Sequence, residues 1–193
     1  MKIFSRIFAT CVKIKTEYVM KKILSIFLVL VFALTLLTAC GKKAEAPKGM
    51  KLASGNAASY SLFIPKDWKI DVQTGYTAAH ISDEDKTNVS VTVYDLEHTD
   101  STVDEWWKVN SEDFAVVCTD YKEIRIGADT VLDGVNAKEY VYSAKLGGVE
   151  YTYHQVAAVT EGGTVYVITY TTTPDKYESH LETFNKITSE FKF

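Results

Sequence analysis

Residues 136–172 of the sequence, NAKEYVYSAKLGGVEYTYHQVAAVTEGGTVYVITYTT, contain three apolar runs that two glycine pairs separate. The first run alternates polar and apolar residues, as strands with one buried face do. The glycine pairs at 147–148 and 162–163 suit hairpin turns, which need positive φ angles. This stretch therefore predicts an antiparallel meander of three strands, over 136–146, 149–160 and 164–172.

Shorter segments upstream of the meander also favour strands. In 88–96, Val89, Val91 and Val93 alternate with polar residues and share one face. The segment 59–65 ends at a proline, a residue that ends a strand or confines it to an edge. The predicted upstream strands are 59–65, 67–72, 76–81, 88–96 and 122–126.

Two further segments predict helices. Ser101 or Thr102 would cap a helix over 103–117, whose early acidic residues suit the helix dipole. Pro174 opens a second helix, which runs to about Phe191 with apolar residues three or four positions apart. The fold class is therefore α+β, an antiparallel sheet of six or seven strands packed by two helices.

The N-terminal part has the pattern of a bacterial secretory signal. Met20, Lys21 and Lys22 are followed by an uncharged apolar run over 23–39. A permanent transmembrane helix competes with this interpretation, because the run approaches the length that a bilayer requires. Two interpretations of residues 1–19 remain: translation starts at Met20, or these residues form an extension of the basic segment that precedes the apolar run.

The apolar run ends in Leu37, Thr38, Ala39 and Cys40, which resemble the bacterial lipobox at all four positions. The resemblance implies diacylglyceryl transfer to the Cys40 sulfur and cleavage between Ala39 and Cys40. An unprocessed membrane helix with an incidental cysteine is the alternative. Because two acyl chains anchor a protein stably, we expect a lipid-anchored protein at the cell membrane, facing the extracytoplasmic side.

The domain organisation follows from these patterns. Residues 1–39 are the expected signal peptide, and 58–193 are the expected folded domain. Between them, 40–57 combines the lipidated Cys40 with glycines, lysines and few large apolar residues, which predicts a flexible tether.

Charge limits the possible partners. The chain has a formal net charge of −4, but residues 1–39 hold six basic residues and one acid, which leaves −9 for the rest. Such an acidic remainder repels phosphate backbones, so we expect no nucleic acid partner. No C-x-x-C motif occurs, and Cys118 lies in an apolar segment typical of a small buried residue.

Motifs that carry chemistry are absent from the sequence, including G-x-S-x-G, the P-loop, H-E-x-x-H and G-x-G-x-x-G. The acidic stretch from Asp83 begins like a calcium loop, but Asn88 and Tyr94 stand where glycine and glutamate are required. His80 and His154 could share a metal only from distant strands. We therefore expect no enzyme activity and no metal or cofactor.

Three stretches resemble the PsbP-like family, which includes the extrinsic photosystem II subunit and many non-photosynthetic bacterial lipoproteins. They are YSLFIPKDW at 60–68, VLDGVNAKEY at 131–140 and a closing SEF at 189–191. The resemblance covers most of 59–193. It implies an α-β-α sandwich around an antiparallel sheet, and binding or assembly rather than catalysis. Nothing in the chain implies a photosynthetic role.

Aromatic residues remain as candidates for binding. Six tyrosines lie on the meander strands, where they line a ligand groove or pair across the sheet beneath helices. Trp106 and Trp107 point in different directions from one helix, so one would face the core and the other would contact a partner. The candidate binding residues are Trp106, Trp107, Tyr142, Tyr151 and Tyr153.

Two functional hypotheses follow. The first is a lipid-anchored binding or assembly module for a protein or envelope component. The alternative is a lipoprotein that binds a small molecule or metal through the Tyr-lined face of the sheet.

Overall fold

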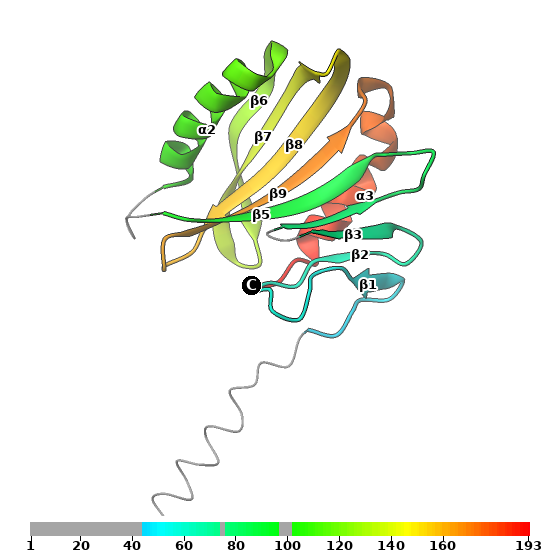
Figure 1. The fold of residues 1–193 in the computed structure, drawn as a ribbon. Helices are drawn as coiled ribbons and strands as arrows, with labels where there is room; N and C mark the ends of the chain where they lie inside the picture. The colour runs from blue at the N-terminus through cyan, green and yellow to red at the C-terminus, as the bar shows by residue number, and fades with distance from the viewer. Residues whose placement is uncertain (1–43, 74–75, 97–101) are drawn as a thin grey trace, which may run out of the picture. The chain divides into compact units, whose positions relative to one another are not determined.

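The computed structural model describes residues 44–73, 76–96 and 102–193. The expected signal peptide, the lipobox and Cys40 lie outside the described residues. The elements in chain order (Figure 1) are β1 Met50–Leu52, β2 Phe63–Pro65, β3 Lys69–Gln73, β4 Tyr76–His80, β5 Asn88–Asp95, α2 Val103–Val117, β6 Thr119–Leu132, β7 Val135–Leu146, β8 Val149–Val159, β9 Thr164–Thr172, the 3-10 turn η1 Pro174–Lys176 and α3 Tyr177–Ser189.

Seven strands form one antiparallel sheet in the order β3-β4-β5-β9-β8-β7-β6. The predicted meander is confirmed as β7, β8 and β9, and positive φ angles at Gly147 and Gly148 close its first turn. The strand number expected for the main sheet is also confirmed. β1 and β2 pair separately as a two-stranded ladder.

The two helices cover opposite faces of the sheet, as Figure 1 shows. On the α3 face, Ile168, Phe184 and Phe191 belong to a core that also takes in the β1–β2 ladder. On the α2 face, Trp107, Tyr140 and other residues make a second core. This α-β-α arrangement is the fold class that the sequence predicts.

The helix α2 has the bounds expected from its cap. Of the two candidate caps, Thr102 is the one used, because its side-chain oxygen accepts a hydrogen bond from the Glu105 amide. The Glu105 carboxylate accepts from the Thr102 amide in return. This capping box satisfies two backbone donors that no helical carbonyl can reach. The final helix is interrupted at its start by η1 and ends at Ser189, near the expected boundary.

Strand β6 is much longer than the predicted 122–126. It pairs with β7 over its whole length, but the register shifts at three places. Each bulge adds a residue that faces neither side regularly, and Gly127 takes a positive φ in one of them. The alternation that reveals a strand in a sequence is therefore broken. Conversely, the strand expected over 59–65 is limited to β2.

The tether expected over 40–57 overlaps the folded domain, so that boundary is corrected. Strand β1 pairs with β2, with Met50 opposite Pro65 and Leu52 opposite Phe63. The Met50 side chain is only 4% exposed and belongs to the α3-side core. A strand of three residues is too short to show a recognisable alternation of polar and apolar residues. Its partner strand is also not adjacent in the sequence, since Lys51 pairs with Ile64, 13 residues later.

Replacing Met50 with alanine is expected to destabilise the domain by about 2 to 3 kcal/mol, because a buried methionine side chain is lost from the core. Urea unfolding of the wild type and the variant measures this difference. Lys48→Ala, at an exposed position just before β1, is the matched control and should change little. If Met50→Ala is as stable as the wild type, residues 50–52 belong to the tether and not to the folded domain.

Candidate functional site

The aromatic candidates meet between α2 and the sheet in what we call the aromatic layer. Trp107 stacks on Tyr140, with 4.1 Å between ring centroids and 14° between ring planes. Tyr142 stacks on Tyr153 at 5.0 Å. Further contacts complete the layer, whose members are Tyr94, Trp106, Trp107, Phe114, Tyr121, Tyr140, Tyr142, Tyr151 and Tyr153.

Both tryptophans are buried, so the prediction that one of them is exposed to a partner is wrong. Adjacent helix residues point about 100° apart, but an indole ring is long enough for both to reach the sheet. Trp106 contacts Tyr94 and Tyr140, and Trp107 contacts Tyr140 and Tyr142. The pair therefore attaches α2 to the sheet.

The tyrosines divide between packing and partial exposure. Tyr142 is buried beneath α2, whereas Tyr151 and Tyr153 lie half-buried at the margin of the aromatic layer. Burial raises the pKa of Tyr153 to about 12, with smaller effects of Cys118 and Tyr151. Its hydroxyl is therefore protonated at neutral pH and cannot act as a base. Of the two sequence interpretations, packing beneath a helix describes Tyr142, and only the margin is open to a ligand.

Four exposed aliphatic residues lie at one end of the domain, which we call the apolar tip. Val116 and Val117 in the last turn of α2 are 86% and 69% exposed. Leu146 and Val149, opposite each other beside the β7–β8 turn, are 49% and 47% exposed. These two elements end at the same edge of the domain, in the upper part of Figure 1.

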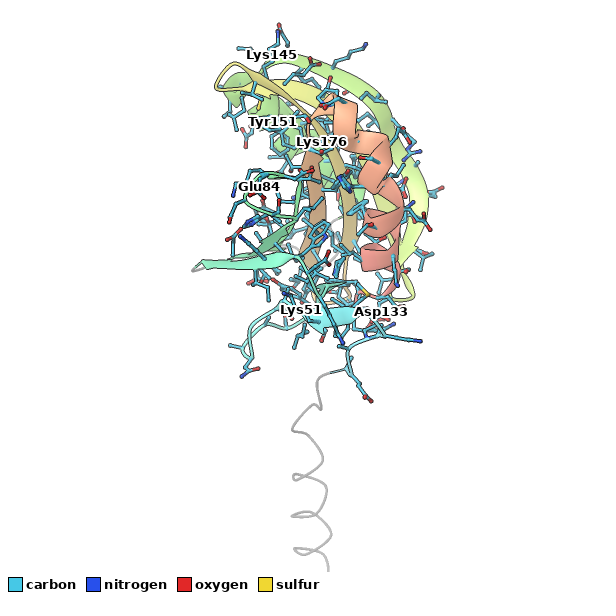
Figure 2. All side chains as sticks on the ribbon, turned by 90° about the vertical axis from the view of Figure 1, so that its right-hand side faces the viewer. Lys51, Glu84, Asp133, Lys145, Tyr151 and Lys176 are labelled. Carbon is cyan, nitrogen blue, oxygen red and sulfur yellow. The ribbon has the colours of Figure 1, made fainter. Side chains whose placement is uncertain are left out.

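The two parts of the apolar tip are joined by neighbouring residues. Thr119, two residues after Val117, pairs with Lys145, which precedes Leu146. The Lys145 ammonium lies 2.7 Å from the Asp120 carboxylate. Figure 2 shows Lys145 near this end and Lys51 near the opposite end, beside the β1–β2 ladder. Sequence reasoning missed the tip, because aliphatic residues at strand and helix ends look like core residues.

A polar group around the buried His154, on the α3 face, also escaped the sequence analysis. The Arg125 guanidinium lies 3.0 Å from the Glu139 carboxylate, which is 3.7 Å from Nε2 of His154. The Tyr177 hydroxyl lies 3.1 Å from Nδ1 of the same histidine. Burial, with a smaller effect of Arg125, lowers the pKa of His154 to about 4. These residues come from β6, β7, β8 and α3, so no local motif could reveal the group.

The histidines do not converge on a metal. His80 lies on the α2 face and His154 on the α3 face, so the two could not share an ion. His80 instead contacts Asp71, with 2.5 Å between Nδ1 and Oδ2. Within the described parts of the chain, no three His, Cys, Asp or Glu side chains group as metal ligands would. Among those same residues, no helix has the length and hydropathy needed to cross a membrane.

Comparison with solved structures defines the class: the domain has the PsbP-like fold, as the sequence resemblance predicts. The cyanobacterial PsbP (CyanoP) of Synechocystis sp. PCC 6803 has a TM-score of 0.54 at 17% identity, covering 80% of this chain and 97% of that one. LpqN of Mycobacterium tuberculosis, involved in cell envelope biogenesis, has a TM-score of 0.55 at 16% identity, covering 74% and 89%.

A third similar structure is the Ran-binding protein Mog1p of Saccharomyces cerevisiae. Its TM-score is 0.52 at 12% identity, and the likeness covers 74% of this chain and 94% of that one. No family model matches the sequence, and no curated protein matches it. At these identities the structural likeness shows the fold alone.

The buried His154 predicts a loss of stability in mild acid. Its pKa is about 4 in the folded protein and about 6.5 in an unfolded chain. Between these pH values only the unfolded state binds the proton, so stability is complete above about 6.5 and falls as the pH drops towards 4. The loss is on the order of 3 kcal/mol, and urea unfolding between pH 7 and 4 measures it.

His154→Gln, which cannot take up this proton, should remove that part of the pH dependence. Asp85→Asn serves as a control and should keep that part of the pH dependence. Burial raises the pKa of Asp85, but hydrogen bonds from Thr87 and Lys176 outweigh this effect and lower the pKa to about 2. Its contribution is lost only at lower pH. An unchanged slope between pH 6.5 and 4 in His154→Gln would contradict the assignment.

Proposed function

We propose that this protein is a lipid-anchored binding module of the bacterial cell envelope, which faces the extracytoplasmic side and holds a protein partner through its apolar tip. The lipobox at 37–40 supports the anchor. The absence of catalytic motifs from the sequence supports a role in binding rather than catalysis. The descriptions of LpqN and Mog1p, one in envelope biogenesis and one Ran-binding, agree with a fold that works by contact.

The exposure of the apolar tip carries this proposal. A single exposed aliphatic residue on a protein surface is ordinary, but neighbouring ones on two elements mark an interaction site. Val116, Val117, Leu146 and Val149 meet that description. The charged pair of Lys145 and Asp120 beside them gives the tip the polar rim that protein interfaces have.

The alternative, a small-molecule or metal site on a Tyr-lined sheet face, receives less support. Three of its five candidate residues, Trp106, Trp107 and Tyr142, are buried between α2 and the sheet. An open hollow of about 590 Å³ lies elsewhere, over the paired strands β6 and β7. Its lining residues are Asp129, Thr130, Val131, Asn136, Ala137 and Lys138.

Crosslinking in intact cells tests the tip. The full-length wild type should yield one reproducible protein adduct, and Leu146→Ser combined with Val149→Ser should reduce it about tenfold, as expected when about 1.4 kcal/mol of contact is lost. Both substitutions are at exposed positions, so the double variant should unfold at the same temperature as the wild type. Val131→Ser, at a valine near the β6–β7 turn that is 61% exposed, is the control. The same adduct at the same yield from the double variant would sink the proposal.

A further inference from the structure

Three lysines gather around the β1–β2 ladder, at what we call the lysine end. Lys48 and Lys66 are exposed, and the Lys66 amide donates to the Gly49 carbonyl, which brings the two lysines beside each other. Lys51 lies on β1 and donates to the Trp68 carbonyl. The ion pairs found among the described residues are made by other basic side chains, so none of these three lysines pairs directly with a carboxylate there.

The charge of the mature chain is strongly polarised along the sequence. Residues 41–68 hold five lysines and two acids, a net charge of +3. Residues 69–193 hold ten basic and 22 acidic residues, a net charge of −12. An anionic surface therefore attracts one part of this molecule and repels the remainder.

The corrected start of the domain leaves few residues between the lysine end and the expected anchor. Only residues 41–49 separate Cys40 from β1, whereas the tether expected from the sequence was twice as long. Nine residues span at most about 30 Å when extended. The start of β1 therefore stays within about that distance of Cys40.

We propose that the lysine end docks on anionic phospholipid headgroups, so that the domain rests on the membrane beside its own anchor. The inference rests on the proposed anchoring at Cys40. Each lysine near an anionic leaflet contributes about 1 kcal/mol, and the short tether keeps the local concentration high. The apolar tip, at the opposite end of the domain (Figure 2), then points away from the bilayer.

Amide hydrogen exchange of the full-length protein in vesicles tests this docking. Vesicles of phosphatidylcholine alone are compared with vesicles that contain about one third phosphatidylglycerol. Peptides covering residues 44–68 should exchange about tenfold more slowly on the anionic vesicles, and raising the salt to about 0.5 M should remove the difference. Equal exchange on both vesicles, or protection of the β7–β8 turn instead, would overturn the proposal.

Matched variants separate charge from anchoring. Lys48→Gln, Lys51→Gln and Lys66→Gln together should abolish the protection. The control Lys108→Gln, Lys122→Gln and Lys186→Gln removes the same charge from three exposed positions elsewhere on the domain and should retain the protection. Labelled palmitate checks the anchor separately. If the wild-type protein takes up no labelled palmitate, the anchor is refuted. If it takes up the label but residues 44–68 are not protected on anionic vesicles, only the docking is refuted.

Discussion

On β7 the consecutive residues Tyr140 and Val141 point to opposite faces of the sheet, and both are buried. The same holds for Val156 and Ala157 on β8. A sheet with apolar side chains on both faces must be covered on both, which requires two helices on opposite sides. The stack of Trp107 on Tyr140 attaches one of these helices, and Phe184 of α3 packs against Tyr170 on the other face.

Because the helices cover both faces, surface for recognition is left mainly at the ends of the domain. The two ends differ in chemistry. The β1–β2 end is basic and continues into the chain that leads to Cys40, whereas the β7–β8 end is apolar. As proposed, one end of the domain would contact the membrane and the other a partner protein. The neutral, buried His154 fits this view, because it is hydrogen-bonded inside the domain rather than presented to a substrate.

Local signals explain which parts of the fold could be predicted from the sequence. The glycine pairs define the meander and Thr102 defines the start of α2, because turns and caps depend on a few adjacent residues. Strand β6 is underestimated because its bulges destroy the alternation. Strand β1 is missed because its pairing with β2 is decided by burial of Met50, which no local pattern records.

The candidate site was harder to predict than the fold. The sequence identifies most of the aromatic residues that form the layer, but not Tyr94, Phe114 or Tyr121. Their burial depends on how α2 lies across the strands. Trp106 and Trp107 thus become structural residues. The apolar tip and the Arg125–Glu139–His154 group arise only when separate elements meet, so neither could be found from spacing. The sequence assigns Lys48 and Lys51 to the tether, whereas the pairing of β1 with β2 shows that they belong to the folded domain.

The central claim is that the two ends of the domain contact different classes of molecule. A photocrosslinking amino acid placed at position 48 or at position 149 of the full-length protein tests it in living cells. The account predicts lipid adducts from position 48 and a protein adduct from position 149. Lipid adducts from position 149, or the same protein adduct from both positions, would contradict it.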